Sequence, residues 1–407
     1  MKIQDKMKQD WDRRAQIDPY YWVAATQEAD LESYENSAQI DCEAFLKGFL
    51  KIKDLEWSEQ VAKTLFQDQV LLDLGCGIGR MTAPLASYFK KAIGVDVSEQ
   101  MIIKAKSLHE TIENLSFYSN SGTDLSMVEP ASVDVVCSYS VLAHLPIDVT
   151  ESYFLEVGKI LKPQGYFRYQ FWVSSTANHP NDQDSLSIHV YDEDHFERLL
   201  SQAGLKVISR EEIDYFDPVL QIKPLWITAQ KVAEPQGFAH VDREIKDSAI
   251  SEEEIMLEYD LILYLAQKYQ ERGENAEAER VLSEAIQLEP NRPEAYLHWT
   301  ALRLALDDLT GTTTILEELT TKCPTCTEGW LYLAQVFQAS EQPFKALESL
   351  EKCDKLLKKE QKALVQSKSQ WSDEHLTQQQ ERLLSIDTHR LSLLKMAQKD
   401  ALKKRKR

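Results

Sequence analysis

A glycine-rich turn after a short apolar run is the segment of this sequence with the clearest chemical meaning. The run Val70–Leu74 carries Asp73 near its end, and Gly75, Gly77 and Gly79 follow at alternate positions. Glycine lets a backbone turn sharply and lets a ligand approach without interference from a Cβ atom. The pattern therefore predicts a nucleotide-like ligand at the end of a buried strand.

The charge of Asp73 narrows the class of ligand. A dinucleotide-binding motif would have its third glycine one residue later, where this chain has Arg80. A carboxylate beside the turn repels a pyrophosphate and attracts a cation. The helix expected to begin near Ile78 offers its N-terminal amides to an anionic group. We therefore expect a zwitterion, and S-adenosylmethionine, which carries ammonium, sulfonium and carboxylate groups, meets both demands.

Strands and helices that alternate along the chain must position these residues. Short apolar runs occupy residues 70–74, 92–95, 115–118, 133–138, 165–173, 205–213 and 225–230. Their alternation with helical segments predicts a doubly wound, mostly parallel sheet. The loop between the last two runs contains Pro218 and Pro224 and has no helical pattern, so we expect these runs to form an antiparallel hairpin. Before the sheet, residues 11–16, 31–49 and 58–66 are expected to be helical.

The order of these segments resembles the class I S-adenosylmethionine-dependent methyltransferases, a family with a seven-stranded Rossmann-like fold. The resemblance covers roughly residues 66–231, and its motifs are Val70–Arg80, Ile93–Met101, Gly122–Leu125, Val133–His144 and Ile160–Tyr166. The last motif departs from the family in having Gln164 where a glycine is usual. The resemblance implies an α/β fold with a mostly parallel seven-stranded sheet, S-adenosylmethionine as the cofactor and methyl transfer as the activity.

The same resemblance implies which residues bind the cofactor. Asp73, Gly75, Cys76 and Gly77 match the motif around its methionyl part. Asp96 lies 21 residues after Gly75 and matches the acid that accepts hydrogen bonds from both ribose hydroxyls. The remaining matches are Val97 and Met101 beside the adenine, Thr123 and Asp124 at the adenine edge, and Ser138 at the end of the fourth strand.

His144 is the first candidate for a general base. It follows the fourth strand at the carboxyl edge of the sheet, where open sheets bind their ligands. Methyl transfer is an in-line displacement, so the main requirement is alignment of the nucleophile, the methyl carbon and the sulfur. A base helps only if the acceptor atom is an oxygen or a nitrogen. A packing role for His144 is an equally open alternative. Tyr139 and Gln170 are weaker candidates for lining the pocket.

An aromatic cluster near the N-terminus suggests a lid. Tyr20, Tyr21 and Trp22 could close over a sulfonium by cation–π attraction. The alternative is that these rings pack a helix onto the sheet. We accordingly assign residues 1–68 to an N-terminal helical lid or extension and residues 69–233 to the cofactor-binding domain.

Beyond a linker at residues 234–258, the sequence repeats with a period of 34 residues. Small or apolar residues recur in register, as in Ile262, Tyr296 and Trp330, or Leu282, Leu316 and Leu350. Residues 259–360 resemble the tetratricopeptide repeat, which implies stacked helical hairpins with a concave surface for a protein partner or substrate. An ordinary helical bundle is the alternative. Residues 361–407 are expected to form capping helices with a basic tail.

Composition limits the remaining possibilities. The net charge is -20, with a positive run at the last five residues, so a nucleic-acid partner is disfavoured. The charged start lacks the apolar core of a signal peptide, and no apolar stretch could span a bilayer, so we expect no membrane partner. Six cysteines suit a reducing cytoplasm. Cys323 and Cys326 have zinc-like spacing without a second pair, which favours a structural turn and no metal.

Three hypotheses for the whole protein remain open. The first is a methyltransferase whose helical repeats recruit a protein substrate or partner. The second is a non-catalytic interaction protein that retains the methyltransferase fold. The third is a small-molecule methyltransferase whose repeats serve assembly, since the fold alone does not select the acceptor. Both acids, Asp73 and Asp96, and the intact glycines favour an active enzyme. The sequence does not indicate an oligomeric state.

Overall fold

The computed structural model describes residues 1–24, 31–175, 188–213, 223–236, 252–366 and 373–405. The chain divides into two compact units, Met1–Glu254 and Ile255–Arg407. The division falls inside the predicted linker, most of which lies outside the described residues, as does Pro218. The two units are described separately below.

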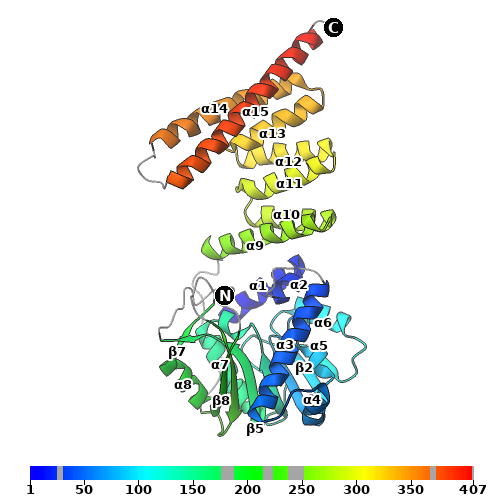
Figure 1. The fold of residues 1–407 in the computed structure, drawn as a ribbon, viewed down its shortest axis with the longest axis vertical. Coiled ribbons are helices and arrows are strands. Elements are labelled where there is room, and N and C mark those ends of the chain that lie inside the picture. Colours follow the sequence, from blue (N-terminus) through cyan, green and yellow to red (C-terminus); the bar gives the residue numbers. More distant parts are fainter. Residues whose placement is uncertain (25–30, 176–187, 214–222, 237–251, 367–372, 406–407) are drawn as a thin grey trace. The chain divides into compact units, whose positions relative to one another are not determined.

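The first unit contains a seven-stranded sheet with the strand order β3-β2-β1-β4-β5-β9-β8 (Figure 1). The strands of this sheet are β1 (Val70–Leu74), β2 (Lys91–Asp96), β3 (Leu115–Ser119), β4 (Val133–Ser138), β5 (Leu161–Phe171), β8 (Leu205–Glu212) and β9 (Leu225–Lys231). Each of the seven apolar runs is therefore a strand, as predicted. A separate two-stranded pair, β6 (Val173–Ser174) and β7 (Tyr191–Asp192), was not foreseen.

The first five strands pair in parallel, whereas β9 runs antiparallel to both β5 and β8. The predicted terminal hairpin is therefore confirmed, with β9 inserted between β5 and β8. Strand order reverses at β1, which lies between β2 and β4, and Asp73 pairs with Gly94 on one side and Cys137 on the other. Ligands of open α/β sheets bind outside the carboxyl ends of the strands at such a switch point.

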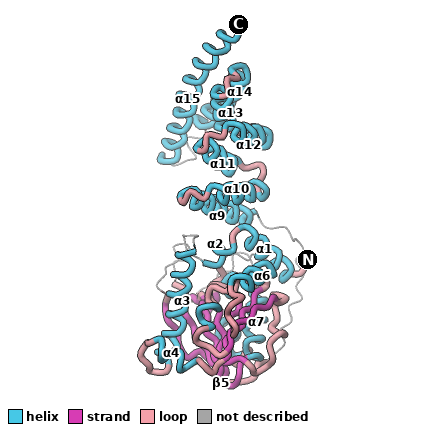
Figure 2. Tube along the Cα trace, turned by 90° about the vertical axis from the view of Figure 1, so that its right-hand side faces the viewer, coloured by secondary structure: helices cyan, strands magenta, loops and turns pink. Residues whose placement is uncertain are grey.

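Helices cover both faces of this sheet, and Figure 2 shows the strands enclosed by them. The helices of the unit are α1 (Ile3–Ile17), α2 (Pro19–Ala24), α3 (Leu31–Ile52), α4 (Glu59–Phe66), α5 (Thr82–Ala86), α6 (Glu99–Leu108), the 3-10 turn η1 (Leu142–His144), α7 (Ile147–Ile160) and α8 (Glu193–Gln202). The predicted N-terminal helices are confirmed, although the first begins at Ile3 and is followed by the short α2.

Successive side chains of β1 pack against helices on opposite faces of the sheet. Leu71 packs with apolar residues of α3, α4 and α5, whereas Leu72, the next residue, packs with those of α7 and α8. Successive side chains of a strand point to opposite faces, so a continuous apolar strand needs helices on both. Two residues of α1, Ile3 and Met7, belong to the cluster on the α7 side. The N-terminal extension is thus part of the core of this unit.

The second unit consists of helices that repeat with the predicted period. Its members are α9 (Glu252–Glu271), α10 (Asn275–Leu288), α11 (Pro293–Ala305), α12 (Leu309–Lys322), α13 (Thr327–Ala339), α14 (Pro343–Gln366) and α15 (Asp373–Arg405). The helices α9, α11 and α13 end at residues 271, 305 and 339, and α10, α12 and α14 begin at residues 275, 309 and 343. Both series advance by 34 residues, which is the period that the sequence predicts.

The positions that recur in the sequence form the interior of the second unit. Ile262 and Tyr296, at the same repeat position, are both almost fully buried, as are Leu282, Leu316 and Leu350. Long helix α15 then packs along α13 and α14, and Leu383, Ile386 and Leu393 join their apolar cluster. The C-terminal segment, where capping helices were expected, thus contributes one described helix, which packs on α13 and α14.

Cys323 and Cys326 lie at the turn between α12 and α13. Cys323 ends α12, and the Cys326 sulfur accepts a hydrogen bond from the Gly329 amide at 3.4 Å as the N-cap of α13. Among the described residues, no group of three or more His, Cys, Asp or Glu side chains is arranged to hold a metal ion. No helix of the described part of the chain is both long and apolar enough to cross a bilayer.

Candidate functional site

The glycine turn after β1 adopts a backbone that side chains would obstruct. Gly75, Gly77 and Gly79 have φ angles of 75°, 52° and 89°. This left-handed region is open to glycine at little cost. A Cβ atom on Gly75 would lie 2.4 Å from a methyl carbon of Val141, so there is also no space for a larger residue. The amide of Gly75 donates to the Val95 carbonyl at 2.8 Å, which fixes the turn to β2.

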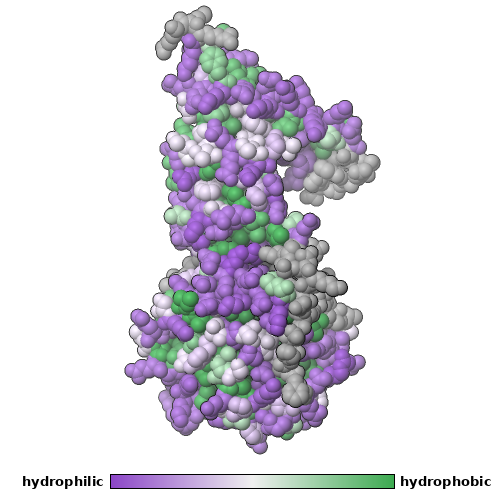
Figure 3. All heavy atoms as spheres, turned by 180° about the vertical axis from the view of Figure 1, so that it is seen from behind, coloured by the Kyte–Doolittle hydropathy of each residue, from purple (hydrophilic) through white to green (hydrophobic). Residues whose placement is uncertain are grey.

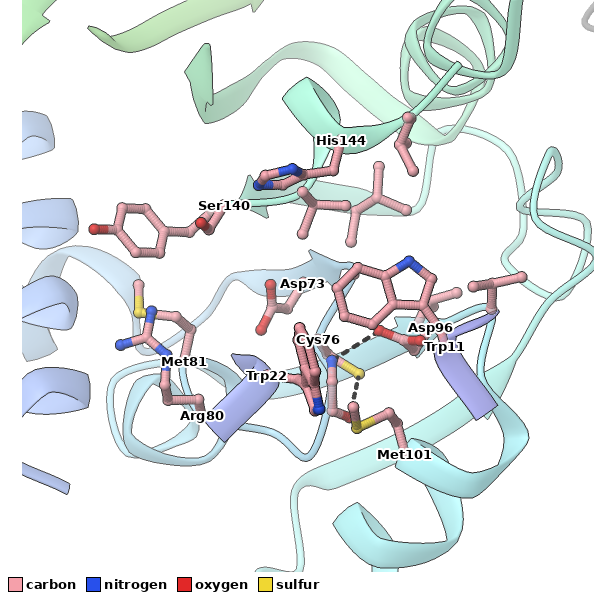
Figure 4. A pocket seen from close by; sticks show the side chains of 18 of the residues that line it. Trp11, Trp22, Asp73, Cys76, Arg80, Met81, Asp96, Met101, Ser140 and His144 are labelled. Atoms are coloured by element: carbon pink, nitrogen blue, oxygen red, sulfur yellow. Dashed lines mark hydrogen bonds between the residues drawn. The ribbon is translucent and has the colours of Figure 1, made fainter. Parts of the chain in front are cut away.

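A cavity of about 190 Å³ opens beside this turn (Figure 4). Its walls come from the carboxyl ends of β1, β2 and β4, the segments that follow them, and the N-terminal helices. The lining residues are Met7, Trp11, Trp22, Asp73, Leu74, Gly75, Cys76, Gly77, Arg80, Met81, Val95, Asp96, Val97, Met101, Tyr139, Ser140, Val141, His144, Leu145 and Tyr153. The cavity thus lies at the topological switch point of the sheet.

Asp73 supplies a buried carboxylate to the cavity. Only 2% of the residue is exposed, and its Oδ2 atom accepts a hydrogen bond from the Thr82 hydroxyl at 2.6 Å. Burial raises the pKa of the carboxyl from 3.8 to about 6, because a desolvated charge is disfavoured. The hydrogen bond and the nearby Arg80 oppose this rise. A cationic ligand would satisfy the carboxylate that remains ionised at neutral pH.

Asp96 supplies the second carboxylate, half-buried at the end of β2. Its Oδ2 atom accepts from the Gly77 amide at 2.8 Å, and its Oδ1 atom accepts from the Ser98 amide at 2.9 Å. Burial raises its pKa to about 6, and the negative charge of Asp12 acts in the same direction. The two amides hold the carboxylate in one orientation, in which it faces the cavity and can accept hydrogen bonds from a ligand.

Two further predicted residues follow Asp96 in the wall. Val97 and Met101 line the cavity, and Met101 lies in the first turn of α6. The Ser98 hydroxyl accepts from the Met101 amide at 3.1 Å and caps this helix. Cys76 is also in the lining, and its burial raises the pKa of its thiol well above the ordinary range. Cys76 is therefore an apolar part of the wall at neutral pH.

His144 lies on the side of the cavity above Asp73 in Figure 4, at the end of η1. The backbone before it is unusual, because Ser140 has a φ angle of 59°. The Ser140 amide donates to the Gln170 side-chain oxygen at 2.9 Å, which stabilises this conformation. Gln170 therefore shapes the wall from behind, whereas Tyr139 and His144 line it directly.

Three predicted residues lie outside the cavity lining. The Ser138 hydroxyl donates to the Leu74 carbonyl at 3.0 Å and is fully buried. The Thr123 carbonyl accepts from the Ser152 hydroxyl at 2.6 Å. Asp124 accepts hydrogen bonds from Ser121 and Ser126, which together lower the pKa of its carboxyl against the effect of burial. The structure thus brings together Asp73, the turn, Asp96, Val97, Met101 and His144, but not these three.

The N-terminal aromatic cluster only partly faces the cavity. Trp22 lines it, while Tyr21 packs edge-on against Trp22 with the ring centres 5.2 Å apart. Tyr20 contacts a small apolar cluster formed with Ile78 and Met101. Sequence reasoning missed Met7 and Trp11, which line the cavity from α1. Trp11 lay in a predicted helix and Met7 lay before it, because α1 begins at Ile3 and not at residue 11. Nothing local in the sequence indicated which helix would lie over the site.

Arg80 is a further lining residue that was noted only as a departure from a glycine motif. Its side chain is 4% exposed, and its Nη1 atom donates to Asp41 of α3 at 2.7 Å. The guanidinium carbon lies 5.2 Å from the centre of the Tyr139 ring. One end of the cavity thus presents a buried cation opposite the carboxylate of Asp73, and the two suit the two charges of a zwitterion.

Comparison with known proteins identifies this part of the fold. Residues 72–169 match the family model of the methyltransferase domain. The chain contains a methyltransferase domain. The matched segment begins in β1 and ends in β5, so it includes the glycine turn, both carboxylates and His144.

Curated relatives match a part of this chain. A probable S-adenosylmethionine-dependent methyltransferase of Saccharomyces cerevisiae is 35% identical over 106 residues, which are 25% of this chain and 35% of that protein. Phosphoethanolamine N-methyltransferase 1 of Zea mays is 30% identical over 141 residues, or 33% of this chain and 28% of that protein. The chain therefore spans about a third of the length of these relatives.

Solved structures align with about half of this chain. Magnesium protoporphyrin IX methyltransferase from Synechocystis, with bound S-adenosylmethionine, aligns with a TM-score of 0.40 and 13% identity over 57% of this chain and 98% of its own. An S-adenosylmethionine-dependent methyltransferase from Methanosarcina mazei aligns with a TM-score of 0.35 and 19% identity over 44% of this chain and 100% of its own.

Proposed function

We propose that this protein binds S-adenosylmethionine in the cavity and catalyses transfer of its methyl group to an acceptor. The observation that carries this proposal is the pair of carboxylates that line the cavity beside the glycine turn, buried Asp73 and half-buried Asp96, in a segment that matches a methyltransferase domain. Burial of an ionisable group without a ligand is unfavourable, and such groups mark binding sites. The donor is a cation with ribose hydroxyls, so it suits both carboxylates.

Several lining residues have a role in this proposal. Asp73 attracts the ammonium group of the donor, and Asp96 accepts hydrogen bonds from its ribose. Gly75 and Gly77 let the methionyl part approach the backbone, and Val97 and Met101 provide an apolar surface for the adenine. When bound, the donor supplies an activated methyl group. The chain contributes alignment and exclusion of water, which are the main requirements of an in-line displacement.

His144 is proposed as the group that removes a proton from an oxygen or nitrogen acceptor. It lines the same cavity as Asp73, and a base must lie within hydrogen-bond reach of the acceptor. Tyr139 and Met81 form the neighbouring wall and would contact the acceptor rather than the donor. A carbon acceptor or a pre-ionised acceptor would not require this step.

Calorimetry with S-adenosylmethionine and S-adenosylhomocysteine tests donor binding. Micromolar binding of both by the full chain, lost on Asp96→Ala substitution, supports the proposal. Absence of binding at millimolar concentration would instead support a non-catalytic interaction protein that retains the fold. Incubation with a labelled methyl donor and fractionated cell extract then tests transfer, and the labelled fraction identifies the class of acceptor.

The second unit is proposed to recruit a protein substrate or partner in the cytoplasm. The support for this is the 34-residue period of its helical pairs, because stacked hairpins expose an extended surface to peptides. On the face drawn in Figure 3, apolar residues of this unit lie in small patches among hydrophilic ones. Label entering a protein fraction would support recruitment. Label entering only small molecules would favour the alternative, in which the repeats serve assembly.

A further inference from the structure

Asp12 joins the N-terminal helix to the helix that follows the second strand. It lies in α1, and its Oδ1 atom accepts two hydrogen bonds from the start of α6, one from the Ser98 hydroxyl at 2.7 Å and one from the Gln100 amide at 3.1 Å. The first amides of a helix have no partner within the helix, and an anion there is favourable. Asp12, a residue of the N-terminal extension, therefore provides a hydrogen-bond acceptor for an amide in the first turn of α6.

Ser98 links this contact to the donor site. Its hydroxyl donates to Asp12, and its amide donates to Asp96 Oδ1 at 2.9 Å. The residue is fully buried, so neither bond competes with water. Asp96 is fixed in turn on the other side by the Gly77 amide. One short chain of hydrogen bonds thus runs from α1 through Ser98 to the carboxylate and the glycine turn.

Trp11, the residue before Asp12, forms part of the cavity wall. Trp11 lines the cavity together with Met7, one turn earlier in α1. Figure 4 shows the Trp11 indole beside Asp96, at the end of the cavity away from Arg80. Trp11 belongs to no strand or helix of the matched domain segment, so its position depends on how α1 is attached to α6.

We propose that Asp12 is a positioning residue of the donor site, which holds α1 on α6 so that Trp11 covers the bound nucleoside beside Asp96. This inference rests on the proposed function and adds a part of the site outside the matched segment. Asp12 does not contact the cavity itself. It acts through Ser98 on the orientation of Asp96 and through the helix on Trp11.

Kinetics of product dissociation distinguish this role from a purely structural one. If α1 covers the nucleoside, S-adenosylhomocysteine leaves only when the wall formed by Trp11 moves away. Loss of the two hydrogen bonds makes that movement easier and speeds dissociation. Most differences in affinity between variants of one site arise from dissociation rates. A purely structural role would lower the melting temperature and leave dissociation from the folded protein unchanged.

The test measures S-adenosylhomocysteine binding to the full chain by calorimetry and stopped-flow tryptophan fluorescence. Asp12→Ala is expected to speed dissociation at least tenfold. Asp12→Asn keeps an oxygen that can accept both hydrogen bonds, and is expected to stay within threefold of the parent. Lys8→Ala is the matched control, because Lys8 pairs with Glu99 between the same two helices in an exposed contact of 3.4 Å. It is expected to leave the dissociation rate unchanged.

A parental dissociation rate in Asp12→Ala, or an equal effect of Lys8→Ala, would overturn the inference. If Asp12→Ala does not fold, hydrogen exchange of the parent protein decides. S-adenosylhomocysteine is then expected to slow exchange in α1 and at the Gln100 amide, and unchanged exchange at both would overturn the inference. Failure of the parent to bind S-adenosylhomocysteine would refute the proposed function instead, so the two failures are distinguishable.

Discussion

The carboxylate of Asp96 and the backbone amide of Gly77 are joined by a hydrogen bond of 2.8 Å. The bond connects the end of β2 to the glycine turn that follows β1, 19 residues earlier in the chain. Neither residue alone makes a nucleoside site. Together they place an oriented carboxylate next to an exposed backbone, which is the arrangement that the proposed donor needs.

Replacement of this carboxylate is expected to weaken donor binding. Asp96→Asn removes the charge and one of the acceptor oxygens, and a hydrogen bond to a charged group contributes about 1.5–3 kcal/mol. The dissociation constant for S-adenosylhomocysteine should therefore rise roughly tenfold to a hundredfold, since about 1.4 kcal/mol corresponds to tenfold. Glu99→Gln, at an exposed carboxylate in the first turn of α6, should leave calorimetric binding unchanged.

Donor affinity should depend on pH in the weakly acidic range. The pKa values of Asp73 and Asp96 are raised from 3.8 to about 6, so both are ionised at pH 8 and mostly protonated at pH 5. The ionised forms bind the donor, so affinity should fall as pH decreases through 6, by up to about tenfold per pH unit for each group. Calorimetry between pH 5 and pH 8 measures this slope, which should be smaller in Asp73→Asn.

In the protein without ligand, the stability of the fold should fall as pH rises through 6, whereas donor affinity should rise. A carboxyl whose pKa is raised on folding binds its proton more tightly in the folded state, so its stabilising contribution is present at low pH and lost as pH rises through 6. Asp73→Asn should therefore raise the melting temperature more at pH 8 than at pH 5. An equal effect at both pH values would contradict a raised pKa for Asp73.

Gly75→Ala should abolish donor binding and destabilise the first unit. The substitution adds a Cβ atom at a φ angle of 75° and within 2.5 Å of Val141 side-chain atoms. Gly273→Ala is the matched control, because Gly273 has a φ angle of 76° and no atom within 4 Å of the added Cβ. The control should cost only about 1–2 kcal/mol of left-handed strain, in the unfolding transition of the helical unit. Similar losses in both variants would mean that the contact with Val141 is unimportant.

His144 should affect transfer rather than donor binding. His144→Gln removes a base and is expected to slow methyl transfer to an oxygen or nitrogen acceptor by about 10²–10⁴-fold. S-adenosylhomocysteine affinity should stay within about threefold of the parent, as its proposed contacts lie at Asp73 and Asp96. Transfer to the labelled extract fraction at several pH values measures the effect. Unaltered transfer would assign His144 to packing, the alternative that the sequence left open.

Two adjacent leucines test how α15 caps the helical unit. Leu383 is 5% exposed within the cluster on α13 and α14, whereas Leu384 is 67% exposed. Leu383→Ala should lower the free energy of unfolding of this unit by about 2–5 kcal/mol, because it leaves a cavity. Leu384→Ala should change it by no more than about 0.5 kcal/mol. Thermal unfolding of the full chain compares them, and equal stability would mean that α15 does not pack as described.

Much of the fold was predictable because its signals are local. The strands β1 and β4 begin and end at the predicted residues, since each is a short apolar run between turn residues. The period of the second unit was equally visible, because buried positions such as Ile262 and Tyr296 recur every 34 residues. The short pair β6 and β7 was not predictable, because two residues provide no periodic pattern.

The sequence by itself determined which chemical groups the site contains. Asp73, the alternating glycines and Asp96 lie at the carboxyl ends of two consecutive strands, and parallel strands bring these ends to one edge of the sheet. Only the tertiary structure decided which distant segments complete the wall. Trp11 lines the cavity from α1, whose Asp12 accepts a hydrogen bond from Ser98 beside α6. Ser138 lies outside the lining and donates to the Leu74 carbonyl. The positions of these two side chains depend on contacts between residues that are far apart in the chain. A local sequence pattern carries no information on the strength of such contacts.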